Sequence, residues 1–405
     1  MTTPSPVPVR RDTPTLLIAA ALALAAAVSL GLSRFSYALL LPPMRLDLGW
    51  SYLTAGTMNT VNAAGYLAGA LWAPRWLRRF GARRTLLGGG FAAAMLLVAH
   101  GAFTSDAALY VLRTLTGIAS AATFVSGGLL AARLGGAAGS SARGAPSAGL
   151  VLGTYYGGTG VGIVISAWLV PALSDGAGAH GWRWAWAALG AAAAVATAIT
   201  AAATRTLDAA VAPAASNASF DKRRFGFSLV SYFLFGLGYI GYMTFVITLL
   251  HEQHLSGTAI TVFYALLGLA VIASSWVWAG LLQRHRGGGA MRLLNALLAL
   301  ATVLPVLSTH PVAVFASGLL FGGVFLSVVA STTALVRHNL EPAAWPAGIA
   351  IFTTVFAAGQ IVGPTLVGWL ADGAGGLRGG LACSAAVLLL AALIASGQRP
   401  VAQAH

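Results

Sequence analysis

Long uncharged apolar runs follow one another along almost the whole chain, and they restrict the fold more than any other feature of the sequence. Many of these runs exceed the roughly 18 residues that a helix needs to cross a lipid bilayer. Hydrophobic residues make up 58% of the 405 residues and charged residues only 8%, whereas about a quarter of a soluble globular protein is charged. The sequence therefore predicts an all-α integral membrane protein.

We expect twelve membrane-spanning helices connected mostly by short loops. The expected spans are residues 15–41, 52–74, 85–104, 107–132, 148–172, 184–204, 225–250, 257–282, 290–308, 311–336, 346–371 and 377–397. The basic and then apolar start of the chain resembles a signal peptide. Its apolar run continues to Leu41, however, which is too long for such a peptide, so we expect the run to be retained.

One connection, residues 205–224, is longer than the others. It contains Pro213 and a basic cluster at Lys222-Arg223-Arg224, a composition typical of a linker. The expected organisation is a cytoplasmic tail (1–14), a six-helix bundle (15–204), a cytoplasmic linker (205–224), a second six-helix bundle (225–397) and a cytoplasmic tail (398–405).

The lysine and arginine residues are distributed unevenly between the two sets of loops. If the N-terminus is cytoplasmic, eighteen of the 23 lie on that side, three lie on the other side and two lie within spans. Cytoplasmic loops of membrane proteins carry this excess of positive charge. Both termini are therefore expected in the cytoplasm. Topology, rather than nucleic-acid binding, accounts for the net charge of +14.

A short sequence in the first span returns in the second half of the chain. Residues 31–37 (GLSRFSY) resemble residues 236–242 (GLGYIGY) at a separation of 205 residues, with Tyr239 in the place of Arg34. The same separation relates residues 113–117 to 318–322 and Ser51 to Ser256. Spans one to six and seven to twelve run in the same direction, so the repeat predicts two pseudo-symmetric bundles, as in many secondary transporters.

Several of these sequences also resemble a known family. Arg113-x-x-x-Gly117 in the fourth span resembles the span-four arginine motif of the major facilitator superfamily, and residues 78–84 (RRFGARR) resemble its cytoplasmic loop signature. The four sequences at 31–37, 78–84, 153–158 (GTYYGG) and 181–186 (GWRWAW) are together similar to its YbfB-like bacterial branch. The resemblance covers nearly the whole chain. It implies a twelve-helix alternating-access transporter in the bacterial inner membrane.

Two positions depart from the family pattern. Arg78 stands where the loop signature normally has an acidic residue, and Thr154 stands where drug/proton antiporters usually have proline. The second departure disfavours a drug antiporter. The residues expected to form the cytoplasmic gate loop are Arg78, Arg79, Gly81, Arg83 and Arg84.

Two arginines, Arg34 and Arg113, lie inside expected spans, and each is seven residues from the expected outer end. A guanidinium group inside a membrane costs several kcal/mol unless a partner or water surrounds it. None of the nine acidic residues lies deep in a span. The sequence therefore predicts an anion from outside the protein, most simply a carboxylate, as their partner. Arg113 also has a structural interpretation as a helix-packing residue, and Arg34 has one in which its head extends to the membrane surface.

Further polar side chains in apolar runs are candidates to contact the body of the anion. Asn59, Asn62 and Tyr66 follow a spacing that places them on one helix face. The other candidates are Tyr37, Tyr155, Tyr156, Tyr239, Tyr242 and Gln360. Each of them can also be explained as an interhelical hydrogen bond. His251 and Glu252, at an outer span end, form the candidate proton site, with a solvated pair as the alternative.

These observations predict a secondary active transporter of a small organic anion such as a monocarboxylate. We expect a monomer whose partners are this anion and the lipid bilayer, with no nucleic acid, cofactor or metal. The alternative is a broad-specificity efflux carrier of hydrophobic compounds. A membrane-embedded enzyme is disfavoured because no span contains an Asp/Glu/His cluster. The single cysteine, Cys383, allows neither a disulfide framework nor a thiolate metal site.

Overall fold

The computed structural model describes residues 15–139, 147–174, 178, 180–207 and 221–401, and these residues contain helices and no strand. The expected all-α membrane fold is therefore confirmed. The expected tail at 1–14 and most of the expected linker lie outside the described residues, as does the end of the tail at 398–405.

The first half of the chain forms one bundle. Its elements are α1 (Thr15–Ala26), the π-helix η1 (Ala27–Phe35), α2 (Tyr37–Leu48), α3 (Tyr52–Phe80), α4 (Ala82–His100), α5 (Asp106–Gly139), α6 (Ala148–Ser174) and α7 (Gly181–Ala203). The elements α1, η1 and α2 follow one another without a loop, so together they make the first span.

The second half forms the other bundle. Its elements are the short 3₁₀ helix η2 (Lys222–Phe225), α8 (Gly226–Glu252), α9 (Gly257–Val277), α10 (Ala279–Arg284), α11 (Gly289–Leu307), α12 (Pro311–Asn339), the 3₁₀ turn η3 (Pro342–Ala344), α13 (Trp345–Ala371) and α14 (Gly376–Ala395). The elements α9 and α10 together make the eighth span.

Eleven of the described helical segments are long and apolar enough to cross a membrane. The remaining expected span, the second (52–74), corresponds to α3, which has 29 residues. This helix is less hydrophobic than the others because it carries Asn59 and Asn62 in its middle and basic residues in its last turns. Long buried helices that tolerate amides in this way commonly line the interior of a bundle.

The first span is longer than the sequence indicated. It was expected to end at Leu41, but α2 continues through Pro42 and Pro43 to Leu48 and is capped by Gly49, whose φ is +66°. Proline removes a backbone hydrogen bond, which neighbouring helices can compensate in a membrane protein. Arg34 therefore lies fourteen residues from the outer helix end, about 21 Å along the axis, and not seven residues from it.

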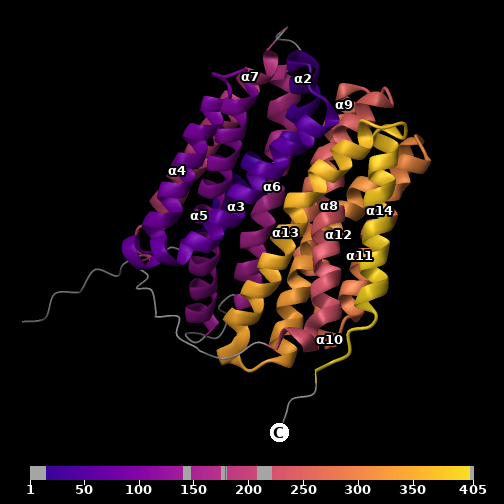
Figure 1. The fold of residues 1–405 in the computed structure, drawn as a ribbon. Helices are drawn as coiled ribbons and strands as arrows, with labels where there is room; N and C mark the ends of the chain where they lie inside the picture. Colours follow the sequence, from indigo (N-terminus) through magenta and orange to yellow (C-terminus); the bar gives the residue numbers. More distant parts are fainter. Residues whose placement is uncertain (1–14, 140–146, 175–177, 179, 208–220, 402–405) are drawn as a thin grey trace, which may run out of the picture.

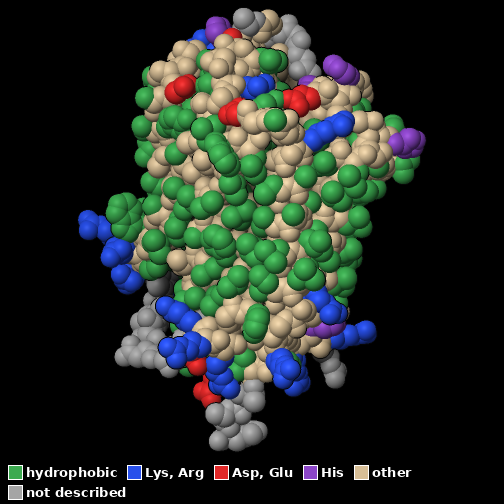
Figure 2. All heavy atoms as spheres, turned by 45° about the vertical axis from the view of Figure 1, so that its right-hand side comes forward, with side chains coloured by type: hydrophobic (Ala, Val, Ile, Leu, Met, Phe, Trp, Pro, Cys, Tyr) green, Lys and Arg blue, Asp and Glu red, His purple; other side chains and the backbone are tan. Residues whose placement is uncertain are grey.

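The two bundles lie side by side, with α3 against α13, α6 against α9 and α2 against α8 (Figure 1). Figure 2 shows a broad band of apolar side chains between two polar ends. Most of the visible Lys and Arg side chains lie at or toward the lower end in this view, while the upper end carries several Asp and Glu side chains. The lower end is the one that the loop charges predict to be cytoplasmic, and the opposite end is called the outer end below.

Helices of the first bundle approach most closely where glycine leaves room for a neighbouring backbone. A Cβ atom on Gly162 of α6 would lie 2.5 Å from the carbonyl oxygen of Ala27 in η1, and one on Gly158 would lie 1.9 Å from that of Ala23. Such contacts favour helix association in lipid because backbones then pack directly. The position of η1, which carries Arg34, is therefore set by α6.

We expect Gly162→Val to destabilise the first bundle by about 1–3 kcal/mol, because the added methyl groups overlap the η1 backbone. The matched control is Gly88→Val in α4, where an added Cβ has no neighbour within 4 Å. Thermal unfolding of the purified proteins in detergent measures both changes. Equal melting temperatures for the two variants would contradict the assigned close packing.

Candidate functional site

The candidate site is built on η1, a nine-residue π-helix in the middle of the first span. Turns of this kind are wider than α-helical turns, are rare, and occur frequently at functional sites. The N–H of Ser36 donates to the carbonyl of Gly31 at 3.0 Å, and the hydroxyl of Ser33 donates to that of Val28 at 2.7 Å. All nine residues are buried.

Arg34 contacts the second bundle from this π-helix. Its Nη2 donates to Oε1 of Gln360 in α13 at 3.2 Å, and Nε2 of Gln360 donates to the hydroxyl of Tyr239 in α8. The pseudo-equivalent positions 34 and 239 therefore meet through one glutamine. The Arg34 side chain is only 3% exposed, so its head does not reach a membrane surface. Its Nε is buried without a hydrogen-bond partner.

Arg113, in contrast, is held by fixed acceptors within the first bundle. Its Nη1 donates to the carbonyl of Ser33 at 3.0 Å, its Nη2 to Oδ1 of Asn59 at 3.2 Å, and its Nε to the carbonyl of Met58 at 3.3 Å. The guanidinium also lies over the ring of Tyr37, 4.6 Å from the centroid. This single side chain therefore joins α5 to η1 and α3.

Neither guanidinium is paired with a carboxylate in the described part of the chain. The one ion pair found there joins His180 to Asp47 at the outer end. Both guanidinium groups are thus surrounded by neutral dipoles and aromatic rings. The difference between them is that Arg113 has an acceptor for each of its three nitrogens, whereas Arg34 does not.

Most of the other candidate side chains have partners within the protein. Asn59 donates to the hydroxyl of Thr244 in α8 at 2.7 Å, and Asn62 donates to the carbonyl of Arg113 at 2.9 Å. Three tyrosine hydroxyl groups also have partners. That of Tyr37 donates to the carbonyl of Ala55, that of Tyr155 donates to the carbonyl of Phe124, and that of Tyr242 is hydrogen-bonded to the hydroxyl of Ser317. Their hydroxyl groups therefore already join helices to one another.

Tyr66 lies close to Arg34, and Tyr156 belongs to α6, which packs against α9 of the other bundle. The Arg34 Cζ atom is 5.8 Å from the ring centroid of Tyr66. Tyr156 contacts Phe124, with their ring centroids 5.8 Å apart. The Tyr156 side chain is nevertheless 40% exposed.

The outer ends of the bundles are joined by hydrogen bonds to two acidic residues. The carboxylate of Asp372, at the end of α13, accepts from the backbone N–H groups of Tyr52 and Leu53 at 2.8 and 2.9 Å. These groups begin α3, where the helix dipole also favours a negative charge. Glu252 of α8 accepts from the hydroxyl of Tyr52. Arg45 lies over the Tyr52 ring, 3.8 Å from its centroid. We name these five residues the outer latch.

His251, next to Glu252, lines a mostly apolar crevice of about 210 Å³ at the same end. The crevice lies between α2, α6, α8 and α9, and Pro42, Pro171 and Ile260 are among its walls. The two residues of the expected proton site thus face different surroundings, because Glu252 belongs to the outer latch.

The expected cytoplasmic gate loop connects α3 to α4. Gly81 has a φ of +78°, which favours glycine there. Arg83 donates to the carbonyl of Ala201 at the end of α7 at 2.9 Å, and Arg79 lies over the ring of Phe80. Arg78 and Arg84 are exposed. Among the described residues, none of these side chains is paired with an acid.

Arg34, Tyr239 and Gln360 are among the candidates expected from the sequence, whereas of the outer latch only Glu252 is, and as part of a proton site. Asp372 and Tyr52 are separated by 320 residues. Each is of a residue type that is common at the end of a span. A repeat comparison aligns the two halves with one another but does not indicate which loop residues meet across the bundle boundary.

One family model matches most of the chain. It is described as uncharacterised MFS-type transporter YbfB and matches residues 26–396. No curated protein matches the sequence. Among solved structures, a mutant of the nucleoside transporter NupG has a TM-score of 0.72 at 14% identity, covering 94% of this chain and 97% of that one.

Two further solved structures have the same architecture. A bacterial homologue of the human lysosomal transporter Spinster, in an inward-facing, unoccupied conformation, has a TM-score of 0.68 at 15% identity, with 95% and 97% covered. The human organic anion transporter MFSD10 has a TM-score of 0.61 at 14% identity, with 95% and 100% covered. At these identities the comparison extends to the fold alone.

We expect Arg113→Lys to lower the stability of the protein by about 1–3 kcal/mol. The ammonium group keeps the charge but cannot donate in three fixed directions to Ser33, Met58 and Asn59. Thermal unfolding measures the change. The matched control is Arg292→Lys, on an exposed arginine of α11, and an equal melting temperature for both variants would contradict the packing role of Arg113.

We expect Asp372→Asn to favour opening at the outer end. An amide offers one acceptor where the carboxylate offers two, and it carries no charge for the α3 dipole. A loss of about 1.4 kcal/mol changes the ratio of open to closed molecules about tenfold. The readout is labelling of Thr60→Cys, at the α3–α13 contact, by an impermeant maleimide in a Cys383→Ser background.

The matched control for this experiment is Asp47→Asn. It removes another outer carboxylate, but one whose bonds to His180 and Trp182 stay within the first bundle. Labelling rates that rise equally in both variants, or in neither, would show that the outer latch does not hold the bundles together.

Proposed function

Because the chain belongs to the YbfB-type family of the major facilitator superfamily, we propose that it transports a small organic anion, such as a monocarboxylate, across the bacterial inner membrane. It does so as a secondary active transporter by alternating access. Both termini lie in the cytoplasm, the protein acts as a monomer, and the chain is a transporter rather than an enzyme.

The observation that carries the proposal is the incomplete pairing of Arg34. Its guanidinium is buried between the bundles, its Nη2 has a neutral partner, and its Nε has none. A buried donor without a partner costs about 1–3 kcal/mol, and more when the group is charged. A carboxylate that binds two guanidinium nitrogens restores the missing bond and neutralises the charge.

The same contact explains how binding can act on both bundles. Arg34 belongs to η1, while Gln360 and Tyr239 belong to α13 and α8. An anion at Arg34 therefore lies next to polar groups of both halves. In alternating access the bundles move about such a central site, so one ligand contributes to the stability of each orientation.

Arg113 has a supporting role in this proposal. It fixes the carbonyl of Ser33, the residue that precedes Arg34, and so holds η1 in place. It also adds positive potential close to the proposed anion site. Asn59 and Asn62 act with it, which leaves Arg34, Tyr66, Tyr156, Tyr239 and Gln360 as the side chains that face the anion.

The membrane potential constrains the direction of transport. Moving one negative charge inward against 100 mV costs about 2.3 kcal/mol, so an uncoupled carrier of this kind favours export. Uptake requires exchange for another anion or a co-transported proton. Protonation of Glu252 in the outer latch is one route to such coupling, and His251 lies beside it.

The second candidate is a broad-specificity efflux carrier of hydrophobic compounds. The aromatic side chains around Arg34 and the apolar crevice at the outer end favour it. The two proposals differ in one requirement. Transport of neutral hydrophobic compounds does not depend on the guanidinium of Arg34, whereas transport of a carboxylate does.

We expect Arg34→Lys to fold normally and to lose carboxylate binding at least about tenfold, because lysine cannot form the two parallel hydrogen bonds. A thermal-shift screen of the wild-type protein against acetate, lactate, pyruvate and benzoate first selects a ligand. Counterflow of that carboxylate in proteoliposomes then compares wild type, Arg34→Lys and the control Arg292→Lys. Undiminished counterflow in Arg34→Lys would refute the proposal.

A further inference from the structure

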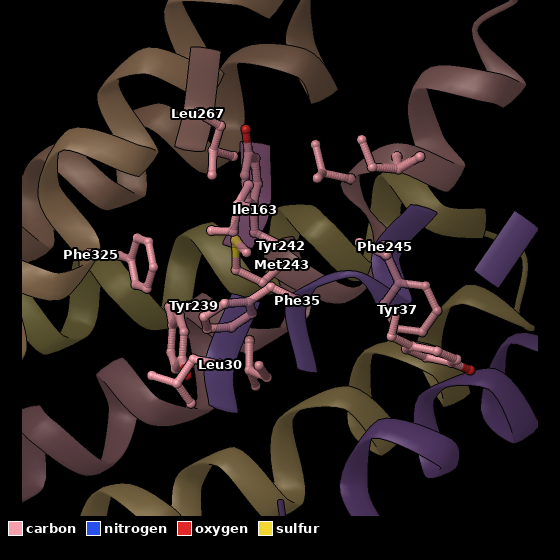
Figure 3. Packing of buried hydrophobic residues seen from close by; sticks show 14 of the residues in the cluster. Leu30, Phe35, Tyr37, Ile163, Tyr239, Tyr242, Met243, Phe245, Leu267 and Phe325 are labelled. Carbon is pink, nitrogen blue, oxygen red and sulfur yellow. The ribbon is translucent and has the colours of Figure 1, made fainter. Parts of the chain in front are cut away.

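Aromatic rings from both bundles converge around Arg34. In the second bundle, Phe235, Tyr239 and Phe356 form a nearly parallel stack, with centroid separations of 4.8–5.6 Å and interplanar angles of 10–20°. Phe325 continues the stack at 5.9 Å from Tyr239 and meets Phe35, beside Arg34, edge to face (Figure 3).

The first bundle contributes rings on the other side of Arg34. Tyr66 lies against the guanidinium, and its ring centroid is 6.5 Å from that of Phe124. Phe124 in turn contacts Tyr156 at 5.8 Å. Arg34 lies over Tyr66 of the first bundle and is joined through Gln360 to Tyr239 of the second, so the two groups of rings lie on either side of its guanidinium.

Core packing explains only part of this arrangement. Phe235, Tyr239 and Phe325 are at most 2% exposed and fill the second bundle as ordinary core residues. Tyr66, Phe124 and Phe356, however, are only partly buried, and Tyr156 is 40% exposed. Aromatic surface left accessible in the interior, next to a cation whose Nε lacks a partner, is typical of a ligand site.

We propose that the transported anion is an aromatic carboxylate, which has a planar ring joined to its carboxyl group. This inference rests on the proposed function, since it assigns the carboxylate to Arg34. The ring then lies among Tyr66, Tyr156 and Phe356. Aromatic pairs at such distances gain affinity beyond the area they bury, through offset-stacked or edge-to-face contacts. A saturated ring of similar size lacks this contribution.

Three small compounds distinguish the contribution of the carboxylate to binding from that of the aromatic ring. Benzoate has both, cyclohexanecarboxylate has the carboxylate on a saturated ring, and benzamide has the aromatic ring without the charge. We expect the dissociation constant of benzoate, from calorimetry on the purified protein in detergent, to be about tenfold lower than that of cyclohexanecarboxylate. We expect no measurable binding of benzamide.

The outcomes distinguish this inference from the proposed function. Equal affinities for benzoate and cyclohexanecarboxylate overturn the ring assignment and leave the anion site standing. Benzamide binding as tightly as benzoate overturns both and supports the hydrophobic efflux carrier. Binding of neither benzoate nor cyclohexanecarboxylate overturns the aromatic-carboxylate assignment, whereas the proposed function then depends on the acetate, lactate and pyruvate of the thermal-shift screen.

The Phe356→Leu variant tests where the ring of the bound anion lies. We expect Phe356→Leu to remove the preference for benzoate over cyclohexanecarboxylate while cyclohexanecarboxylate binding changes less than twofold, because leucine keeps apolar volume without an aromatic face. The matched control is Phe91→Leu in α4, a ring that is 41% exposed and remote from the site, and it should keep the tenfold preference. A preference that persists in Phe356→Leu contradicts the placement of the ring. The compound series on the unsubstituted protein tests the class of anion even if this variant folds poorly.

Discussion

The guanidinium of Arg113 and its three neutral acceptors form the interaction on which the centre of the first bundle depends. A cation in lipid is tolerated only where dipoles or partners surround it. Here the carbonyls of Ser33 and Met58 and the amide of Asn59 do so. Because Asn59 also donates to Thr244 in the other bundle, the same network extends across the bundle boundary. The π-helix and Arg34 are positioned by this charge together with the close packing of α6 against η1.

The two buried arginines, Arg34 and Arg113, differ in the number of fixed acceptors around their guanidinium groups. Arg113 has its three nitrogens matched within its own bundle. Arg34 is bonded to one amide of the opposite bundle, and its Nε has no acceptor. A guanidinium group whose nitrogens all have acceptors is suited to a structural role, while one with an unpaired nitrogen is suited to binding a ligand. Sequence alone did not distinguish these cases.

Much of the fold could be predicted because it follows from local composition. Apolar runs indicate the spans, basic loops indicate their orientation, and the repeat relates the two halves. The π-helix could not be predicted, since residues 27–35 carry no signal that separates it from an α-helix. The outer end of the first span was also missed, because Pro42-Pro43 usually marks a helix end. Contacts such as Gln360 with Arg34, separated by 326 residues, depend on tertiary packing alone.

The two ends of the bundle boundary differ in how their charges are used. At the outer end, the carboxylates of Glu252 and Asp372 both accept hydrogen bonds from the start of α3. These acidic groups therefore have partners within the protein when that end is closed, and no ligand is needed. At the centre, the closed arrangement leaves Arg34 short of an acceptor. Under the proposed function, an empty carrier thus retains an unbalanced charge as its bundles move, whereas a loaded carrier does not. This difference favours movement with anion bound in both directions, which is the behaviour of an exchanger.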